Sequence, residues 1–467
     1  MSPLRCVARL LIFTCACSCR LHSYVAAERS PKTRERTMDS KQEATPQSVP
    51  SKSSGEISRI SCIVPCRSMS STLLRSLESI LFSSQYMHSS LQKKVPVEVL
   101  VVDDSDDASE QTKTVFGEFV ASQRVQAQRD TMTWQLLQYR RPVERRVQAR
   151  WAAGAVRNAG VAASSGDVLT FLDADDTWKE NHLLHVFREL EGDVTMGFVK
   201  LPMDFTVPVH TYWRQVVEQV SPINAGVRTE VHRLVGGFPD ITNEDQTYWN
   251  VLRACIRGRD LNSMEGDGGR AATSLYIARP GNHLFKQQEK FALPPEEAHR
   301  FARQEDETDT TRRRHELQML TGCVAALKGA EHRWERSPFA QLGKALSTLG
   351  VLQMAHGDLL EAEVSMRQAL HYRSELTADT HYNLGTLLLK EERMAEAEVS
   401  MREALRHDPQ HVQARNNLAG ILAKSHRTQE AMEEWRSILA DHPDDVQVRR
   451  NLAAIEASLN TNRKLEF

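Results

Sequence analysis

A ten-residue segment occurs three times in the last third of the chain at nearly constant spacing. Residues 361–370 read EAEVSMRQAL, residues 396–405 read EAEVSMREAL, and residues 430–439 form a more divergent copy. The copies start 35 and 34 residues apart. A period of this length predicts stacked helix pairs. One pair cannot bury its own apolar face, so about three pairs and a cap are needed for a stable fold.

Residues at fixed positions of each copy support this prediction. Small residues recur where the two helices of a pair would touch: Gly350, Gly385 and Ala419. The period and these positions resemble the tetratricopeptide (TPR) repeat. The resemblance implies an all-α TPR solenoid over residues 337–467, closed by a capping helix, with a peptide or protein partner in its groove. An unrelated bundle of helical hairpins is the alternative.

The 467-residue length predicts two or three domains, and residues 58–290 have a different pattern from the repeats. Apolar strands are expected at residues 60–65, 97–102, 136–139, 168–172 and 194–200. Helices are expected between them, including residues 108–135, 149–165 and one opened by a capping box of Thr177 and Glu180. This alternation predicts an α/β domain with a mostly parallel sheet and helices on both faces. Residues 291–336 are expected to form a helical linker.

Acidic residues follow two of the expected strands. Asp103 and Asp104 follow one, and Asp173, Asp175 and Asp176 follow another. Ligands of open parallel sheets bind at the carboxyl ends of the strands, and grouped carboxylates favour a hard divalent cation such as Mg²⁺ or Mn²⁺. The alternatives are a plain acidic turn for the first pair and a helix N-cap for Asp176.

Three segments together resemble the family-2 glycosyltransferases: residues 101–105 (VVDDS), 157–160 (RNAG) and 166–176 (GDVLTFLDADD). The resemblance implies the GT-A nucleotide-diphospho-sugar transferase fold over residues 58–290. It also implies inverting transfer from a nucleotide sugar, with a UDP-sugar favoured, to an acceptor glycan or protein. By the resemblance, the donor-binding residues would be Pro65, Asp103, Asp104, Arg157, Asn158 and Asp173. Asp173 and Asp175 would hold a divalent cation on the donor diphosphate.

An inverting transfer also needs a general base for the acceptor hydroxyl. Residues 236–245 (GGFPDITNED) resemble the acceptor-side segment of the family, which indicates Asp245 as the base and Glu244 as its neighbour. His283 is a candidate further metal ligand. In the alternative interpretation, the two acids merely favour a helix N-terminus and the histidine is structural.

The sequence departs from the family at two places. Arg67 and Ser68 stand where the family usually has Asn-Glu, and the Gln-x-x-Arg-Trp motif of processive synthases is absent after Asp245. A multi-pass membrane domain is not expected either, so the sequence favours transfer of a single sugar. A different class of function stays open: an inactive GT-A platform on which the repeats act as a protein-binding adaptor.

The first 57 residues indicate targeting rather than a domain. A short apolar run at residues 10–19 and small residues at 25–27 predict a signal peptide or short signal anchor over residues 1–27, and residues 28–57 a disordered linker. The secretory pathway (ER or Golgi lumen) is favoured. An organelle transit peptide and a cytoplasmic protein are the alternatives, since no Asn-x-Ser/Thr acceptor occurs.

Charge and cysteine content exclude other classes. A net charge of −2 gives no field that favours nucleic acid, although arginines between 140 and 150 form a solvated face or an anion-attracting patch. Eight scattered cysteines do not indicate a disulfide framework or a zinc site. Cys62 and Cys66 are expected to be small apolar residues of a buried strand and its end.

Overall fold

The computed structural model describes residues 25–28, 36–37, 56–67, 70–105, 110–140, 153–206, 218–219, 221–241, 244–261, 272–276, 295–328, 341–372 and 375–465. Most of the expected targeting segment and linker, the arginines between 141 and 150, and His283 lie outside these residues. Their assignments stay predictions. In the part of the chain that is described, no helix has the length and apolarity needed to cross a bilayer.

Within the described residues, nine strands form one sheet in the order β11 (Gly258–Asp260), β8 (Phe198–Lys200), β10 (Ala225–Arg228), β6 (Val168–Phe171), β3 (Ile60–Cys66), β4 (Val97–Asp103), β5 (Met132–Tyr139), β1 (Val25–Glu28) and β2 (Arg36–Thr37). The central strands β6, β3, β4 and β5 are parallel to one another, and β10 is antiparallel to both of its neighbours. The mostly parallel sheet predicted from the sequence is therefore confirmed.

Helices cover both faces of the sheet. Successive side chains of a strand point to opposite faces, so neighbouring residues of one strand join different buried clusters. Cys62 and Val64 join one buried cluster with helices α1 (Ser70–Leu91), α2 (Glu110–Ala121) and α6 (His182–Gly192). Ile63 and Val102 join the opposite cluster with helices α5 (Gly154–Ala163), α8 (Thr229–Leu234) and α9 (Glu244–Cys255). Both cysteines of β3 are buried, as expected.

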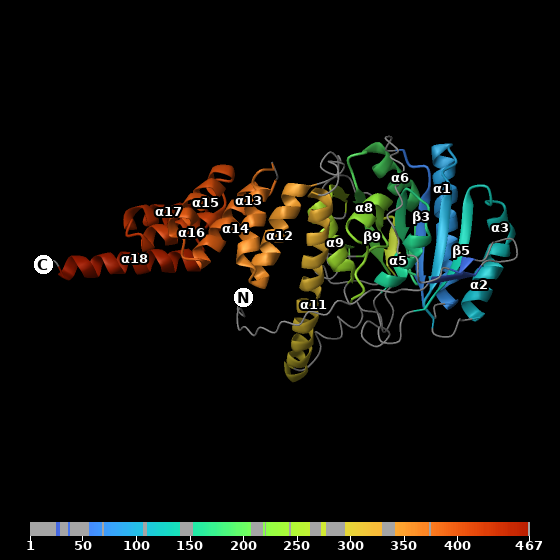
Figure 1. The fold of residues 1–467 in the computed structure, drawn as a ribbon, viewed down its shortest axis with the longest axis horizontal. Helices are drawn as coiled ribbons and strands as arrows, with labels where there is room; N and C mark the ends of the chain where they lie inside the picture. Colours follow the sequence, from blue (N-terminus) through green and yellow to red (C-terminus); the bar gives the residue numbers. More distant parts are fainter. Residues whose placement is uncertain are drawn as a thin grey trace.

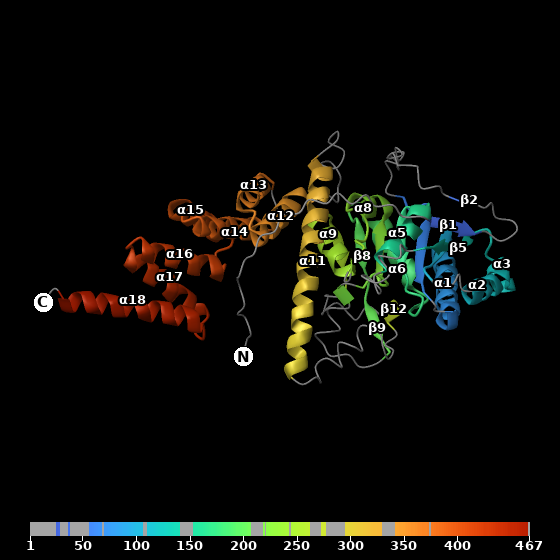
Figure 2. The same ribbon diagram turned by 60° about the horizontal axis from the view of Figure 1, so that its bottom comes forward.

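The second cluster continues into the C-terminal helices. Helix α11 (Pro295–Lys328) packs between α9 and α12 (Leu342–His356), and Figures 1 and 2 show it between the sheet and the repeats. Leu342, Leu346 and Leu349 of α12 are buried in the same cluster as Tyr248 of α9. The apolar core thus crosses the boundary at residue 337 that the sequence predicts.

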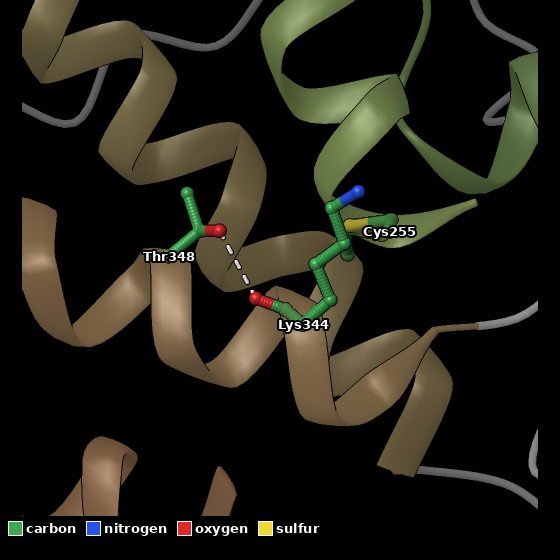
Figure 3. The surroundings of a disulfide bond; sticks show 4 residues. Cys255, Lys344 and Thr348 are labelled. Atoms are coloured by element: carbon green, nitrogen blue, oxygen red, sulfur yellow. Dashed lines mark hydrogen bonds between the residues drawn. A yellow bond between two sulfur atoms is a disulfide. The ribbon is translucent and has the colours of Figure 1, made fainter. Parts of the chain in front are cut away.

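A disulfide between Cys255 at the end of α9 and Cys323 of α11 adds a covalent link across this region. Figure 3 draws it with Lys344 and Thr348 of α12 in its surroundings. The backbone amide of Gln341 also donates to the Cys255 carbonyl at 2.7 Å. No disulfide framework was expected from the scattered cysteines, and this single bond joins two that are 68 residues apart.

The repeats form three helix pairs and a final helix among the described residues: α12 with α13 (Leu359–Ala369), α14 (Thr377–Lys390) with α15 (Met394–His407), α16 (Val412–Lys424) with α17 (Thr428–Asp441), and then α18 (Val446–Leu465). A Cβ on Gly350 would lie 2.6 Å from Met366, and one on Gly385 would lie 2.8 Å from Met401. The small residues are therefore needed where paired helices touch.

Two local predictions were wrong. Thr177 does not open a helix: β7 (Thr177–Trp178) pairs with β12 (Ser274–Tyr276), which also pairs with β9 (Met203–Phe205), and α6 starts after Asn181. The Trp178 indole holds this segment in the core by donating to the Ile223 carbonyl at 2.7 Å. The helix expected over 108–135 ends at α3 (Gln123–Gln126), before β5.

Two strands of the sheet lie in the expected targeting segment and linker, whose assignment stays a prediction. Strand β1 lies at the end of the first and β2 within the second. Strand β1 pairs with the outer edge of β5, with Val25 opposite Tyr139. An open strand edge offers backbone N–H and C=O groups to any extended segment, so this pairing needs no apolar pattern in the sequence.

Candidate functional site

Arg157 on α5 joins acids from two distant parts of the chain. Its Nη1 donates to Asp245 Oδ1 at 2.7 Å and to Glu244 Oε1 at 3.1 Å, and its Nη2 donates to Asp173 Oδ1 at 2.9 Å. The arginine side chain is only 3% exposed, whereas Asp245 is 25% and Asp173 is 32% exposed. The predicted base and one predicted metal ligand therefore lie on one buried guanidinium.

The loop that leads into α9 is held against α5 by close backbone contacts. A Cβ on Gly154 would lie 2.5 Å from the Pro239 carbonyl oxygen, so the loop can approach only a glycine here. The Asn158 amide donates to the Phe238 carbonyl at 2.7 Å and accepts from the Phe238 N–H at 2.9 Å. Both polar ends of Asn158 thus hold the loop before α9, and the donor-side role implied by the resemblance stays a prediction.

Burial sets the proton affinity of the two acids at the start of α9. It raises the pKa of Glu244, and the neighbouring charge of Asp245 raises it further, while Arg157 opposes the shift. Burial also raises the pKa of Asp245, against the effect of Arg157. A carboxylate with a raised pKa accepts a proton more readily, which suits Asp245 to general-base chemistry near neutral pH.

The Asp173–Asp176 segment forms a tight turn at the carboxyl end of β6. The Asp176 amide donates to the Asp173 carbonyl at 2.9 Å, and Ser76 of α1 donates to the Asp176 carbonyl at 2.7 Å. Asp176 does not cap α6, whose N-cap position is Asn181. The turn presents Asp173 and Asp175 as partly exposed side chains, while Asp176 is buried.

Tyr276 of β12 was not predicted from the sequence. Burial raises its pKa, and the charges of Asp176, Asp173, Asp175 and Asp245 raise it further. The charges of the turn after β6 and of the start of α9 thus both act on this phenol, in agreement with the contact of Arg157 with both segments. No sequence signal marks Tyr276, because β12 is a three-residue strand of the small sheet.

Lys200 at the end of β8 is a second unpredicted residue near Asp245. Its buried ammonium donates to the Ser221 carbonyl at 2.6 Å and lies 4.3 Å from the centroid of the Trp249 ring. Burial lowers its pKa well below the usual range. Its position at the end of an expected strand could have marked Lys200 as a candidate site residue, since such strand ends form the ligand-binding edge of the sheet.

Asp103 ends β4, two strands from β6 and at the same edge of the sheet. It is fully buried, and its Oδ1 accepts from the Ser105 N–H at 3.0 Å and the Ser105 hydroxyl at 2.5 Å. The Asp104 amide donates to the Cys66 carbonyl at 2.8 Å, and Pro65 lies opposite Val102 in the sheet. These residues form a separate part of the edge from the acids around Arg157.

Asp173 and Asp175 offer two carboxylates at the carboxyl end of β6. Arg157 pairs with Asp173, Glu244 and Asp245, and burial favours the neutral form of Glu244. Partly exposed carboxylate oxygens are the ligands that Mg²⁺ and Mn²⁺ prefer. His283, the third metal ligand expected from the sequence, lies outside the described residues.

Comparison with protein families decides the class of the chain. Residues 61–229 match the model described as Glycosyl transferase family 2, and residues 347–400 and 388–455 match two models described as Tetratricopeptide repeat. This chain carries a family 2 glycosyltransferase domain joined to tetratricopeptide repeats. Asp103, Asp173 and Asp175 lie within the matched part of the transferase domain, whereas Glu244 and Asp245 lie beyond it.

Solved structures resemble the transferase domain and the repeats only distantly. S. aureus TarS 1-349 is 14% identical at a TM-score of 0.39, over 81% of this chain and 91% of that one. Its complex with UDP-GlcNAc is 15% identical at 0.38, over 81% and 92%. YrrB, described as a TPR protein with an unusual peptide-binding site, is 18% identical at 0.27, over 32% and 72%. A search of curated proteins found no match.

Proposed function

We propose that this glycosyltransferase moves a single sugar from a nucleotide-diphosphate sugar, a UDP-sugar above all, to an acceptor hydroxyl with inversion at the anomeric carbon. The observation that supports this most directly is the contact of Arg157 with Asp173 on one side and Asp245 on the other. A candidate metal ligand and a candidate base thus contact the two terminal nitrogens of one guanidinium. An inverting transfer needs these two functions in one site.

Each acid has a distinct role in this proposal. Asp245 removes the proton of the acceptor hydroxyl as that oxygen attacks the sugar. Glu244 is a positioning residue, because its Oε1 accepts from both Arg157 and the Ala153 N–H, at 3.1 and 2.8 Å. Asp173 and Asp175 would hold a divalent cation, which supplies positive charge to the leaving diphosphate when bound. Asp103 and Asp104, with the backbone near Pro65, would bind the base or ribose of the donor.

The repeats have a different role, which is to bind a protein partner or the protein acceptor itself. Stacked TPR helices form an extended concave surface suited to a peptide segment. Because α12 shares its core with α9, a partner bound to the repeats is connected directly to the helix that begins with Glu244 and Asp245. This connection favours recruitment of the acceptor over a separate adaptor role.

The test is hydrolysis and transfer with Mn²⁺ across a panel of nucleotide sugars, in wild type and Asp175→Asn. We expect turnover with a subset of donors, and loss of metal-dependent nucleotide binding in the variant. Asp444→Asn is a matched control, since Asp444 is exposed in the repeat region. If wild type neither turns over any donor nor binds nucleotide with metal, the transferase proposal is wrong and the adaptor function is favoured.

A further inference from the structure

A second cluster of metal-ligand side chains lies far from the transferase site, in the middle pair of repeat helices. His381 of α14 faces Glu403 and His407 of α15, which are four residues apart and so share one helix face. One ligand atom from each of the three side chains lies within 4.8 Å of the others. The two imidazole rings are nearly parallel, at 12°, with centroids 5.6 Å apart.

The side chain of Arg406 shows that this cluster already attracts a cation. Its Nε donates to Glu403 Oε2 at 2.8 Å, and its Nη2 lies 3.0 Å from His407 Nε2. A guanidinium nitrogen can only donate, so His407 Nε2 accepts from Arg406, and a metal ion that replaced Arg406 would use the same lone pair.

We propose that His381, Glu403 and His407 bind a transition-metal ion of the zinc class. Imidazole nitrogen with one carboxylate suits Zn²⁺, whereas the oxygen-only set at Asp173 and Asp175 suits Mg²⁺ or Mn²⁺. Ligand atoms of a tetrahedral zinc site lie about 3.4 Å apart when each is about 2.1 Å from the metal. Separations of up to 4.8 Å must therefore close by up to about 1.4 Å, and the χ2 torsions of the two nearly parallel imidazoles must turn so that their lone pairs converge on the ion.

The metal would replace the guanidinium of Arg406 and join α14 to α15. The Arg406 side chain is 64% exposed, so it can turn into solvent at little cost. Three protein ligands leave a fourth position for water or for a donor atom of a bound partner. A partner that supplied the fourth ligand would therefore bind this surface of α14 and α15 in a metal-dependent way.

Titration calorimetry of the EDTA-treated full-length chain with ZnCl₂ tests the proposal. We expect His381→Ala and His407→Ala each to remove one bound ion or to weaken its affinity at least about tenfold, because loss of even an outer-shell partner costs that much. His442→Ala, an exposed histidine outside the cluster, is the matched control. Removal of the competing cation in Arg406→Ala should tighten zinc binding, an effect that a purely structural role of the cluster does not predict.

Two further measurements make the outcome decisive. X-ray absorption at the zinc edge should show two imidazole nitrogens at this site, and excess Mg²⁺ should not displace the ion. If His381→Ala does not fold, Glu403→Gln and Arg406→Ala decide the question. Zinc binding of unchanged stoichiometry and affinity in the cluster variants would overturn the proposal.

Discussion

Asp245 and Arg157 form a hydrogen bond of 2.7 Å between Oδ1 and Nη1, across 88 residues of sequence. The same nitrogen also donates to Glu244, so two neighbouring acids share one donor. Arg157 and Glu244 are buried and Asp245 is partly buried, so each depends on its partners, because an isolated buried charge is costly. The geometry of the proposed base is therefore set by a residue of another helix.

Removal of the guanidinium should disable the site and weaken the fold. Arg157→Ala leaves Glu244 and Asp245 buried without their shared cation, and loss of one partner of such a pair costs about 3–5 kcal/mol. Arg157→Lys should recover part of the stability but little turnover, since one ammonium cannot reproduce the planar fork of donors. Urea unfolding and donor turnover measure both effects, with the exposed Arg436→Lys as control. Wild-type stability of Arg157→Ala would show that this network is not needed for folding.

The two acids at the start of α9 should differ in their effect on catalysis. Asp245→Asn removes the proposed base, so kcat should fall by about 10²–10⁴ with donor affinity nearly unchanged. Glu244→Gln should be milder, since burial raises the pKa of Glu244 to about 8 and the group is largely protonated at pH 7. Steady-state kinetics with nucleotide-binding measurements separate the two. A larger loss of kcat in Glu244→Gln would reverse the proposed roles.

Two buried histidines should make the transferase domain sensitive to acid. Burial lowers the pKa of both His182 and His232 to about 3. Between pH 6.5 and 3 the unfolded chain binds more protons than the folded one, so stability is present above pH 6.5 and is lost as the pH falls. The loss at pH 5.5 should be about 1.4 kcal/mol per histidine.

Urea unfolding at pH 7 and pH 5.5 measures this loss. His182→Gln or His232→Asn should each reduce the difference between the two pH values by the contribution of one histidine, whatever their effect on stability at pH 7. His356→Ala, which alters an exposed histidine of α12, should leave the difference unchanged. An equal difference in all four proteins would show that other groups cause the acid sensitivity.

Truncation should show that the first repeat helix is part of the transferase core. A chain that ends after Lys328 lacks α12 and exposes its apolar contacts with α9 and α11. We expect it to unfold at a lower temperature and to aggregate. A chain that ends after Tyr372 keeps α12 and α13, so it should retain donor hydrolysis while it loses acceptor recruitment. Equal melting temperatures for the two truncations would contradict a shared core.

The parts of the fold that repeat or alternate locally could be predicted from the sequence. The repeat copies predicted the helix pairs. The apolar strands that end at Asp103 and Asp173 predicted the ligand-binding edge of the sheet. Contacts between distant segments carry no such signal, which is why Tyr276 and the partners of Arg157 were not predicted. The capping box at Thr177 failed because burial of Trp178 favoured a strand over a helix start.

The continuous core between α9 and α12 has a consequence for which hydroxyl groups can react. If the repeats bind a partner as proposed, the shared core would hold that partner at a set distance and orientation from Asp245, in contrast to a partner tethered by a flexible linker. Only acceptor positions at a set spacing from the docked segment then reach the base. The number of residues between the partner's docking segment and a given hydroxyl side chain would then decide whether that side chain is modified.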